Sequence, residues 1–224
     1  MANLVVGPFL GPVGIGGPDR LREYLEGSHF RVEPWNPIFA WRAWKRSRRL
    51  IRAAINCDGT ILDYGCANGF LLWCLAGWSA YRLEPFGVDL DYAAVMKARE
   101  LFPSTPGNFC RCDALAPEIA NSPTSAARLF RPAPGIAFPT TFNFVYWAAW
   151  DNVSFASRVE RRFFLELFEL VAGQGRLILG LYGTPGSNDV RLQRLIEAGF
   201  APAGRVGTDQ FGVTIAWFDK NGIC

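Results

Sequence analysis

Histidine is almost missing from this chain of 224 residues, which contains only His29. A single histidine excludes metal sites built from several histidines, such as the HExxH helix of zinc proteases. It also leaves only one residue that could serve as the histidine of a Ser-His-Asp triad. None of the six cysteines forms a CxxC pair, which makes a zinc site weakly supported. We therefore expect no bound metal.

Long apolar runs are also missing. No segment approaches the roughly 20 apolar residues that a membrane-spanning helix needs. The first 17 residues are apolar, but they contain no Lys or Arg, whereas a secretory signal begins with a basic region. The cysteines are expected to be reduced, buried thiols, which suits a reducing compartment. The sequence therefore predicts a cytoplasmic protein without a membrane association.

Acidic residues are absent from one basic segment, residues 41–52. Six basic side chains lie there, and the rest of the chain has 17 basic and 20 acidic residues. The six are Arg42, Lys45, Arg46, Arg48, Arg49 and Arg52. Arginine interleaved with tryptophan can hold RNA through phosphate contacts and stacking, and it could equally bind an acidic carrier protein. A nucleic-acid enzyme usually spreads its positive charge more widely. The interpretation of this segment as a nucleic-acid site is therefore not favoured over its interpretation as a solvent-exposed helix face.

Hydrophobic residues make up 50% of the chain and charged residues 19%, which is ample for a folded domain. Residues 19–27 and 36–56 are expected to be helices, and a proline-rich insertion is expected at 114–141. Between and beyond them strands alternate with helices, which is typical of a parallel α/β sheet. The strands are expected at 60–64, 86–90, 108–112, 142–147, 175–182, 200–206 and 213–218, and the helices at 70–78, 92–101, 158–171 and 190–198.

Only six residues separate the last two strands, which is too short for a parallel crossover, so these two strands form an antiparallel hairpin. The predicted fold is α/β: a seven-stranded, mostly parallel sheet with helices on both faces and its last strand antiparallel. An N-terminal segment, residues 1–56, would form a helical cap or lid. Residues 57–224 would form the ligand-binding domain.

A glycine-rich turn follows the first predicted strand and carries the clearest chemical signal. Small residues at Gly65, Ala67 and Gly69 let the backbone approach a ligand closely. The amides at the start of the next helix could then receive a carboxylate or phosphate. The turn lacks the GxGxxG pattern of dinucleotide sites and the lysine of a Walker motif, which argues against NAD and ATP. Asp63 could cap the turn by accepting hydrogen bonds from its amides.

Acidic residues stand at the ends of the next two predicted strands. Asp89 follows the glycine turn by about 20 residues, where an acid can accept hydrogen bonds from both hydroxyls of a ribose. Asp113 follows the third strand and could bind the exocyclic amine of an adenine. Asp91 is expected to be the N-cap of the next helix. Because the carboxyl ends of parallel strands meet at one edge of a sheet, these acids predict a nucleoside site.

The order of these parts resembles the class I S-adenosylmethionine-dependent methyltransferases, over roughly residues 55–220. The family's D-x-G-x-G-x-G turn stands here as Asp63 to Gly69, with alanine in its middle position. The resemblance implies S-adenosylmethionine as cofactor and S-adenosylhomocysteine as product. The cofactor-binding residues that it implies are Asp63, Gly65, Cys66, Ala67, Gly69, Asp89, Leu90, Asp113, Ala114 and Trp147.

The acceptor of the methyl group is expected beyond the fourth and fifth strands. Where an acceptor hydroxyl or amide must lose a proton, a base helps, and the candidates are Asp151 first and His29 second. Asn152 stands where many family members have a histidine. Aromatic residues in the N-terminal segment would form the lid: Tyr24, Trp35, Phe39, Trp41 and Trp44.

The predicted function is methyl transfer to the oxygen or nitrogen of a small aromatic or apolar molecule. Two alternatives stay open. One is an RNA methyltransferase that uses the basic helix 41–52. The other is a non-catalytic relative that binds the cofactor, since the sequence contains no clear base.

Overall fold

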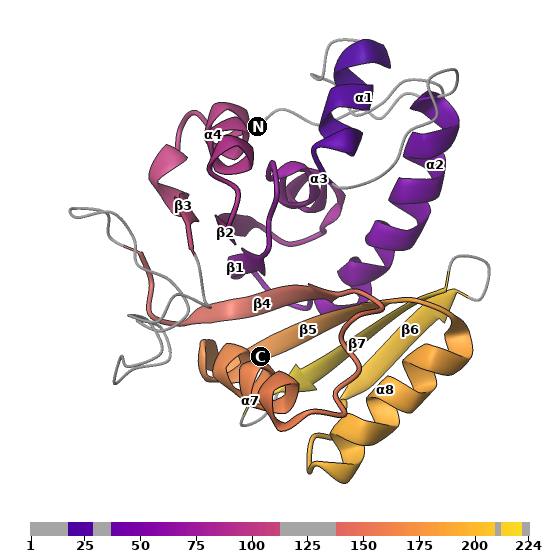
Figure 1. Cartoon of the computed structure of the whole chain (residues 1–224). Coiled ribbons are helices and arrows are strands. Elements are labelled where there is room, and N and C mark those ends of the chain that lie inside the picture. Colours follow the sequence, from indigo (N-terminus) through magenta and orange to yellow (C-terminus); the bar gives the residue numbers. More distant parts are fainter. Residues whose placement is uncertain (1–17, 29–36, 113–137, 209–211, 221–224) are drawn as a thin grey trace.

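The computed structural model describes residues 18–28, 37–112, 138–208 and 212–220. These residues form one seven-stranded sheet with the strand order β3-β2-β1-β4-β5-β7-β6 (Figure 1). Strand β7 is antiparallel to both of its neighbours, and the other described strand pairs are parallel, as predicted. The strands are β1 (Gly59–Tyr64), β2 (Leu83–Asp89), β3 (Phe109–Arg111), β4 (Phe142–Ala149), β5 (Val171–Tyr182), β6 (Gly204–Thr208) and β7 (Val213–Asp219).

Helices cover both faces of the sheet, which confirms the predicted fold class (Figure 1). One face carries α3 (Phe70–Trp78), α4 (Tyr92–Leu101) and the 3-10 segment η1 (Arg49–Ala54), and the other carries α7 (Arg158–Glu169) and α8 (Pro185–Glu197). A short 3-10 turn, η2 (Pro106–Asn108), precedes β3. A sheet covered on both faces needs strands that are apolar on both sides. Accordingly, residues 175–182 of β5 are all buried.

The N-terminal helices α1 (Pro18–Glu26) and α2 (Pro37–Arg48) pack on the outer side of α3. The ring of Trp44 in α2 stacks on Phe70 of α3 with 5.0 Å between centroids, and Trp41 lies 5.9 Å from the same ring. These two tryptophans are buried, whereas Phe39 is 69% exposed. Trp41 and Trp44 therefore attach this segment to α3.

The prediction of one continuous helix over residues 36–56 is wrong, because α2 ends at Arg48 and the chain continues as the 3-10 segment η1. Residues three apart lie on the same side of a 3-10 helix. Ile51 and Ala54 are three apart, and both are fully buried against the sheet. The tighter winding thus presents both apolar side chains to the core.

Two helix starts show how local chemistry sets the boundaries. Asp91 caps α4 as predicted, because its side chain accepts a hydrogen bond from the amide of Ala93 at 2.8 Å. Helix α8 begins at Pro185, earlier than the predicted residue 190, because Thr184 caps it and proline suits the first turn.

Within the described part of the chain, no helix combines the length and apolar character that crossing a membrane requires. Most of the predicted insertion 114–141 lies outside the described residues.

Candidate functional site

The glycine turn joins β1 to α3 and has an unusual backbone. Gly65 and Gly69 have φ values of +85° and +71°, and Ala67 has +48°. Left-handed backbone is uncommon for a residue with a side chain, and it tends to occur at functional sites. The amides of Gly65 and Cys66 both donate to the carbonyl of Val88 at 2.9 Å, which fixes the turn to the end of β2. A side chain at Gly65 would point into open space, so this position faces a cavity.

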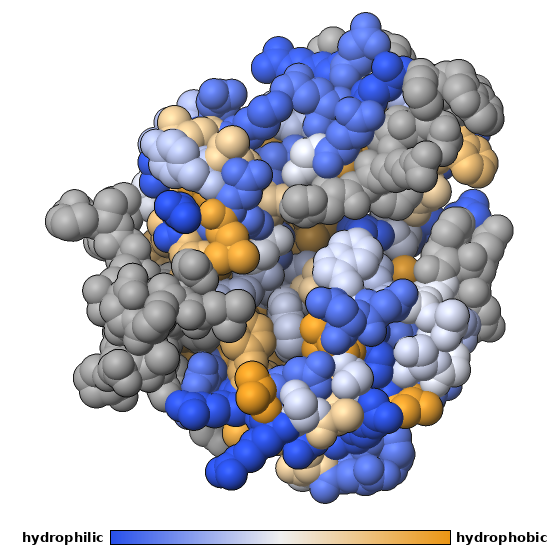
Figure 2. Space-filling view, viewed as in Figure 1, coloured by the Kyte–Doolittle hydropathy of each residue, from blue (hydrophilic) through white to orange (hydrophobic). Residues whose placement is uncertain are grey.

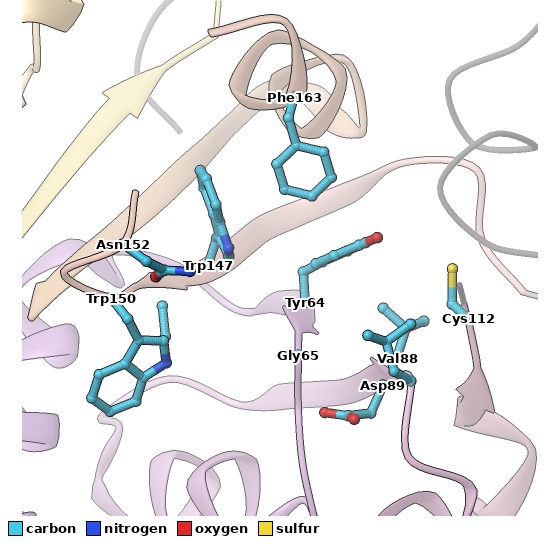
Figure 3. Close-up of a pocket in the computed structure, with 11 residues that line it drawn as sticks. Tyr64, Gly65, Val88, Asp89, Cys112, Trp147, Trp150, Asn152 and Phe163 are labelled. Carbon is cyan, nitrogen blue, oxygen red and sulfur yellow. The ribbon is translucent and has the colours of Figure 1, made fainter. Parts of the chain in front are cut away.

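The carboxylate of Asp89 holds the turn from the end of β2. One oxygen accepts a hydrogen bond from the amide of Ala67 at 2.7 Å, and the other accepts from Asp91 at 2.9 Å. A carboxylate has about four lone-pair positions, so each oxygen of Asp89 can accept one further hydrogen bond. Figure 3 shows the group projecting into the space beside Gly65. Asp89 is therefore able to bind a pair of neighbouring hydroxyls.

A cavity of about 490 Å³ lies beyond the ends of β1, β2 and β4. The space-filling view shows a hollow between the helices on the two sides of the sheet (Figure 2). The walls are mainly aromatic: the rings of Trp147 and Phe163 meet edge-on at 5.0 Å, and Tyr64 lies 5.3 Å from Phe163 (Figure 3). The lining residues are Tyr64, Gly65, Val88, Asp89, Leu90, Cys112, Trp147, Ala148, Trp150, Asn152 and Phe163. This volume is typical of small-molecule sites, and flat apolar walls with one carboxylate suit a nucleoside.

A smaller cavity of about 60 Å³ lies on the α2 side of the same strand ends. It shares Gly65, Ala148 and Trp150 with the larger cavity, so the two are neighbours along the edge of the sheet. Its lining contains more polar groups than that of the larger cavity. The lining residues are Ser28, Trp44, Arg48, Asp63, Gly65, Cys66, Ala67, Leu71, Tyr146, Ala148, Trp150 and Tyr182.

Asp63 is the buried acid of the smaller cavity. It is only 3% exposed, and its carboxyl group accepts no hydrogen bond from any described residue. Burial, with a further contribution from the carboxylate of Asp89, raises the pKa of Asp63 to about 8. The interpretation that Asp63 caps the turn is wrong, since the Ala67 amide bonds to Asp89 instead. A buried acid without a partner fits a ligand that carries a positive charge.

Asn68 attaches the turn to the N-terminal segment, a role that no local pattern in the sequence indicates. Its side-chain oxygen accepts from the amide of Phe70 at 3.2 Å and from the hydroxyl of Ser28 at 3.0 Å. Its amide group donates to the carbonyl of Tyr24 at 2.9 Å. The sequence predicts that amides at the start of α3 could bind a ligand carboxylate or phosphate. The amide of Phe70 instead donates its hydrogen bond within the protein.

We expect Asn68→Ala to lower the free energy of unfolding by about 2–3 kcal/mol, because it leaves buried partners unsatisfied. Thermal and urea unfolding measure this loss. The variant Asn68→Asp keeps the acceptor oxygens but buries a carboxylate and turns one oxygen toward the Tyr24 carbonyl, so its loss should be at least as large at neutral pH and smaller at acidic pH, where the protonated acid can donate. Equal stability of Asn68→Ala and the wild type would contradict this role.

The structure places the other predicted residues as follows. Leu90, 57% exposed, and Trp147, 9% exposed, both line the larger cavity. Cys66 lines the smaller one, and burial raises the pKa of its thiol well above the usual range. Asp151 is exposed with its carboxylate beside Gly183, and it lines neither of these two cavities. His29, Asp113 and Ala114 lie outside the described residues.

Arg191 of α8 is a further residue that the sequence did not reveal. Its guanidinium donates to the carbonyls of Ala149 and Trp150 at 2.7 and 2.8 Å and to Asn188 at 3.1 Å. Asn188 in turn donates to Leu181 at 3.2 Å. The loop after β4, which supplies Trp150 and Asn152 to the larger cavity, is thereby fixed to the end of β5.

This strand order, with a glycine turn after β1 and an acid at the end of β2, is the fold of the class I S-adenosylmethionine-dependent methyltransferases. Solved structures share it. A methyltransferase of this kind from Aquifex aeolicus has a TM-score of 0.55 and 12% identity, over 91% of this chain and 98% of that chain. A TehB-like one from Corynebacterium glutamicum has a TM-score of 0.52 and 17% identity, over 91% of this chain and 100% of that chain.

The glycopeptide N-methyltransferase MtfA has a TM-score of 0.51 and 12% identity, over 78% of this chain and 89% of that chain. No protein-family model matches the chain, and neither does any curated protein sequence. At these identities the similarity shows the fold.

Proposed function

We propose that the protein transfers a methyl group from S-adenosylmethionine to the oxygen or nitrogen of a small aromatic molecule. The observation that carries this proposal is Asp89, whose carboxylate faces an aromatic cavity of about 490 Å³ beside the glycine turn. The two acceptor positions left on Asp89 match the two hydroxyls of a ribose. The aromatic walls and the exposed Leu90 suit the faces of an adenine.

Asp63 supports a cofactor with an amino-acid part. Its buried carboxyl group is complementary to the ammonium of the methionine half. S-adenosylmethionine supplies the methyl group on a positively charged sulfur. Trp150 and Tyr182, whose rings stack at 4.9 Å, line the smaller cavity and would exclude water from the transferred group.

The N-terminal segment, residues 1–56, would act as the cap, and residues 57–224 as the cofactor-binding domain. Ser28 and Trp44 from this segment line the smaller cavity, which supports the division. Where the acceptor must lose a proton, Asp151 and His29 stay our candidate bases. Asp151 would have to turn away from Gly183 to reach an acceptor.

The structure of α2 supports the alternative of an RNA methyltransferase less than the number of basic residues in its sequence does. Arg42, Arg46 and Arg49 are exposed, but Lys45 is half-buried over the ring of Trp41, and Arg48 is buried. The exposed positive charge is therefore smaller than the six basic residues imply. MtfA, which shares the fold, is named for a glycopeptide substrate, so the fold alone does not select an acceptor.

Two measurements test the proposed function. Titration calorimetry with S-adenosylmethionine and S-adenosylhomocysteine should give micromolar dissociation constants. Release of S-adenosylhomocysteine should then be measured with phenols, aromatic amines and a structured RNA as acceptors. Turnover with the small aromatics supports the proposal, and salt-sensitive turnover with RNA supports that alternative. Cofactor binding without any turnover indicates the non-catalytic relative, and no binding by the folded protein refutes the methyltransferase interpretation.

A further inference from the structure

The loop between β4 and α7, residues 150–157, contains a strained residue. Phe155 has a φ of +58° and is fully buried. Left-handed backbone is an outlier for so bulky a residue, and it persists only where the surrounding structure fixes it. The core fixes the ring, which packs edge-on against Trp147 at 5.9 Å and Phe164 at 6.2 Å between centroids. The backbone of the loop must therefore be held in place as well.

Three arginine side chains hold this backbone through its carbonyl groups. Five carbonyl oxygens accept hydrogen bonds of 2.7–3.0 Å from them. The bonds run from Arg191 to Ala149 and Trp150, from Arg194 to Ser154, and from Arg161 to Phe155 and Ala156. Arg161 belongs to α7 and the other two arginines to α8, so the loop is attached to both helices of this face of the sheet (Figure 1). We call these three residues the arginine clamp.

Arg191 is the buried member of the arginine clamp. It is 2% exposed, and no carboxylate in the described part of the chain forms an ion pair with it. Burial lowers the pKa of its guanidinium, and the charges of Asp151 and Glu160 only partly offset this effect. A buried charge is costly, and an apolar side chain of similar size is often at least as stabilising. Stability alone therefore does not account for an arginine here, whereas its bonds to two carbonyl groups of the loop do.

The arginine clamp acts on Trp150, which lies where the two cavities meet. Trp150 lines both of them, together with Gly65 and Ala148. Its carbonyl group is bonded to Arg191, and its ring stacks on Tyr182 at 4.9 Å. A molecule with its nucleoside part in the larger cavity and its amino-acid part in the smaller one must cross this junction. In S-adenosylmethionine, the sulfur that carries the methyl group joins these two parts.

We propose that Arg191 is a positioning residue, which acts with Arg161 and Arg194 to hold the loop in one conformation before any ligand binds and so keeps Trp150 at this junction. In-line transfer of a methyl group needs fixed distances, and a displacement of about 1 Å can lower the rate about 100-fold. The hold on the loop is independent of the proposed function, whereas its consequence for methyl transfer rests on that function.

Amide hydrogen exchange of the full chain, followed residue by residue by NMR, tests the arginine clamp. The amide of Val153 donates to the carbonyl of Trp150 at 2.9 Å, so its protection depends on the group that Arg191 holds. Arg191→Met should speed exchange at Val153 by about tenfold or more relative to β5, because the loop then opens locally. Arg191→Lys keeps the charge without the planar pair of donors, so its effect should be smaller.

Arg161→Gln tests the other end of the loop. The Ala156 carbonyl, which Arg161 binds, belongs to the same peptide group as the Ser157 amide. That amide donates to Glu160 at 3.1 Å. Arg161→Gln should therefore speed exchange at Ser157 more than at Val153. It decides the question together with Arg191→Lys if Arg191→Met does not fold.

Leu195→Ala is the matched control for a loss of stability alone. Leu195 lies one turn further along α8, is fully buried and has no side-chain group that could bond to the loop. This variant should speed exchange at Val153 no more than in β5.

A second readout is the fluorine NMR signal of 5-fluorotryptophan at position 150, assigned with Trp150→Phe. The wild type should give one narrow line, which Arg191→Met broadens or splits. With any acceptor that is turned over, Arg191→Met should lower kcat about 100-fold and change the KM for S-adenosylmethionine less than about fivefold, because Asp89 and the glycine turn are intact.

Three results separate the outcomes. Unchanged exchange at Val153 and an unchanged Trp150 signal in folded Arg191→Met overturn the arginine clamp. If S-adenosylhomocysteine slows the loop amides more than those of β5, the ligand orders the loop, which also overturns it. A loosened loop in Arg191→Met, in a chain that binds no S-adenosylhomocysteine, supports the arginine clamp and refutes the proposed function.

Discussion

Substitution of Asp89 by alanine is expected to weaken the binding of S-adenosylmethionine by about 100-fold. Hydrogen bonds to a charged group contribute about 1.5–3 kcal/mol each, and at the lower end of this range the loss of two such bonds to the ribose corresponds to about two powers of ten in affinity. The substitution also removes the acceptor for the amide of Ala67 and so loosens the glycine turn. Titration calorimetry on the folded variant measures the change.

Two further variants isolate the role of Asp89. Asp89→Asn keeps one acceptor oxygen and loses the charge, so its affinity should fall about tenfold. Asp91→Ala is the matched control, because Asp91 caps α4. It should lower stability by about 0.5–2 kcal/mol and leave cofactor affinity unchanged. If Asp89→Ala folds and binds the cofactor as tightly as the wild type, Asp89 does not hold the ribose.

Binding of S-adenosylhomocysteine at pH 7 is expected to release nearly one proton from Asp63. The pKa of this acid is raised to about 8 in the free protein, so at pH 7 its carboxyl group is mostly protonated. An ammonium bound beside it favours the charged form and drives the proton off. Calorimetry in two buffers of different ionisation enthalpy, such as phosphate and Tris, gives the number of protons released.

Two comparisons test the assignment of this proton. Asp63→Asn should release none, and neither should the wild type with 5′-methylthioadenosine, which has no ammonium. Equal proton release by the wild type and Asp63→Asn would show that another group loses the proton.

The same acid makes the stability of the free protein depend on pH. The ordinary pKa of Asp63 is 3.8 and the folded one is about 8. Between these values the folded state keeps a proton that the unfolded state has lost. The contribution of Asp63 to the free energy of unfolding is therefore fully present below about pH 4. It is lost as the pH rises to 8, at up to about 1.4 kcal/mol per pH unit. Urea unfolding between pH 4 and pH 8 should show that the free energy of unfolding falls with pH more steeply in the wild type than in Asp63→Asn.

The strands and most helices followed from the sequence, because local patterns specify them. The apolar run at the end of β5 and the capping residue Asp91 are signals contained within a few neighbouring residues. The glycine turn and Asp89 were found in the same way, since their spacing reflects a single β-α-β unit. The end of α2 was missed because a 3-10 turn depends on how Ile51 and Ala54 meet the sheet.

The smaller cavity could not be predicted in this way. Arg48, Tyr146 and Tyr182 come from three distant segments, and only the packing of α2 and η1 on the sheet brings them together. The roles of Asn68 and Arg191 are equally non-local, because their hydrogen bonds reach Tyr24 and Ala149 across 44 and 42 residues. No periodicity or motif in the chain encodes such contacts.

The hydrogen bond from Phe70 to Asn68 has a consequence for competition among cellular nucleotides. Nucleotide sites that accept phosphates use the amides at the start of a helix, and here the side chain of Asn68 already satisfies the Phe70 amide. Abundant ATP and pyridine dinucleotides should therefore compete poorly for this site, even where they are far more concentrated than S-adenosylmethionine.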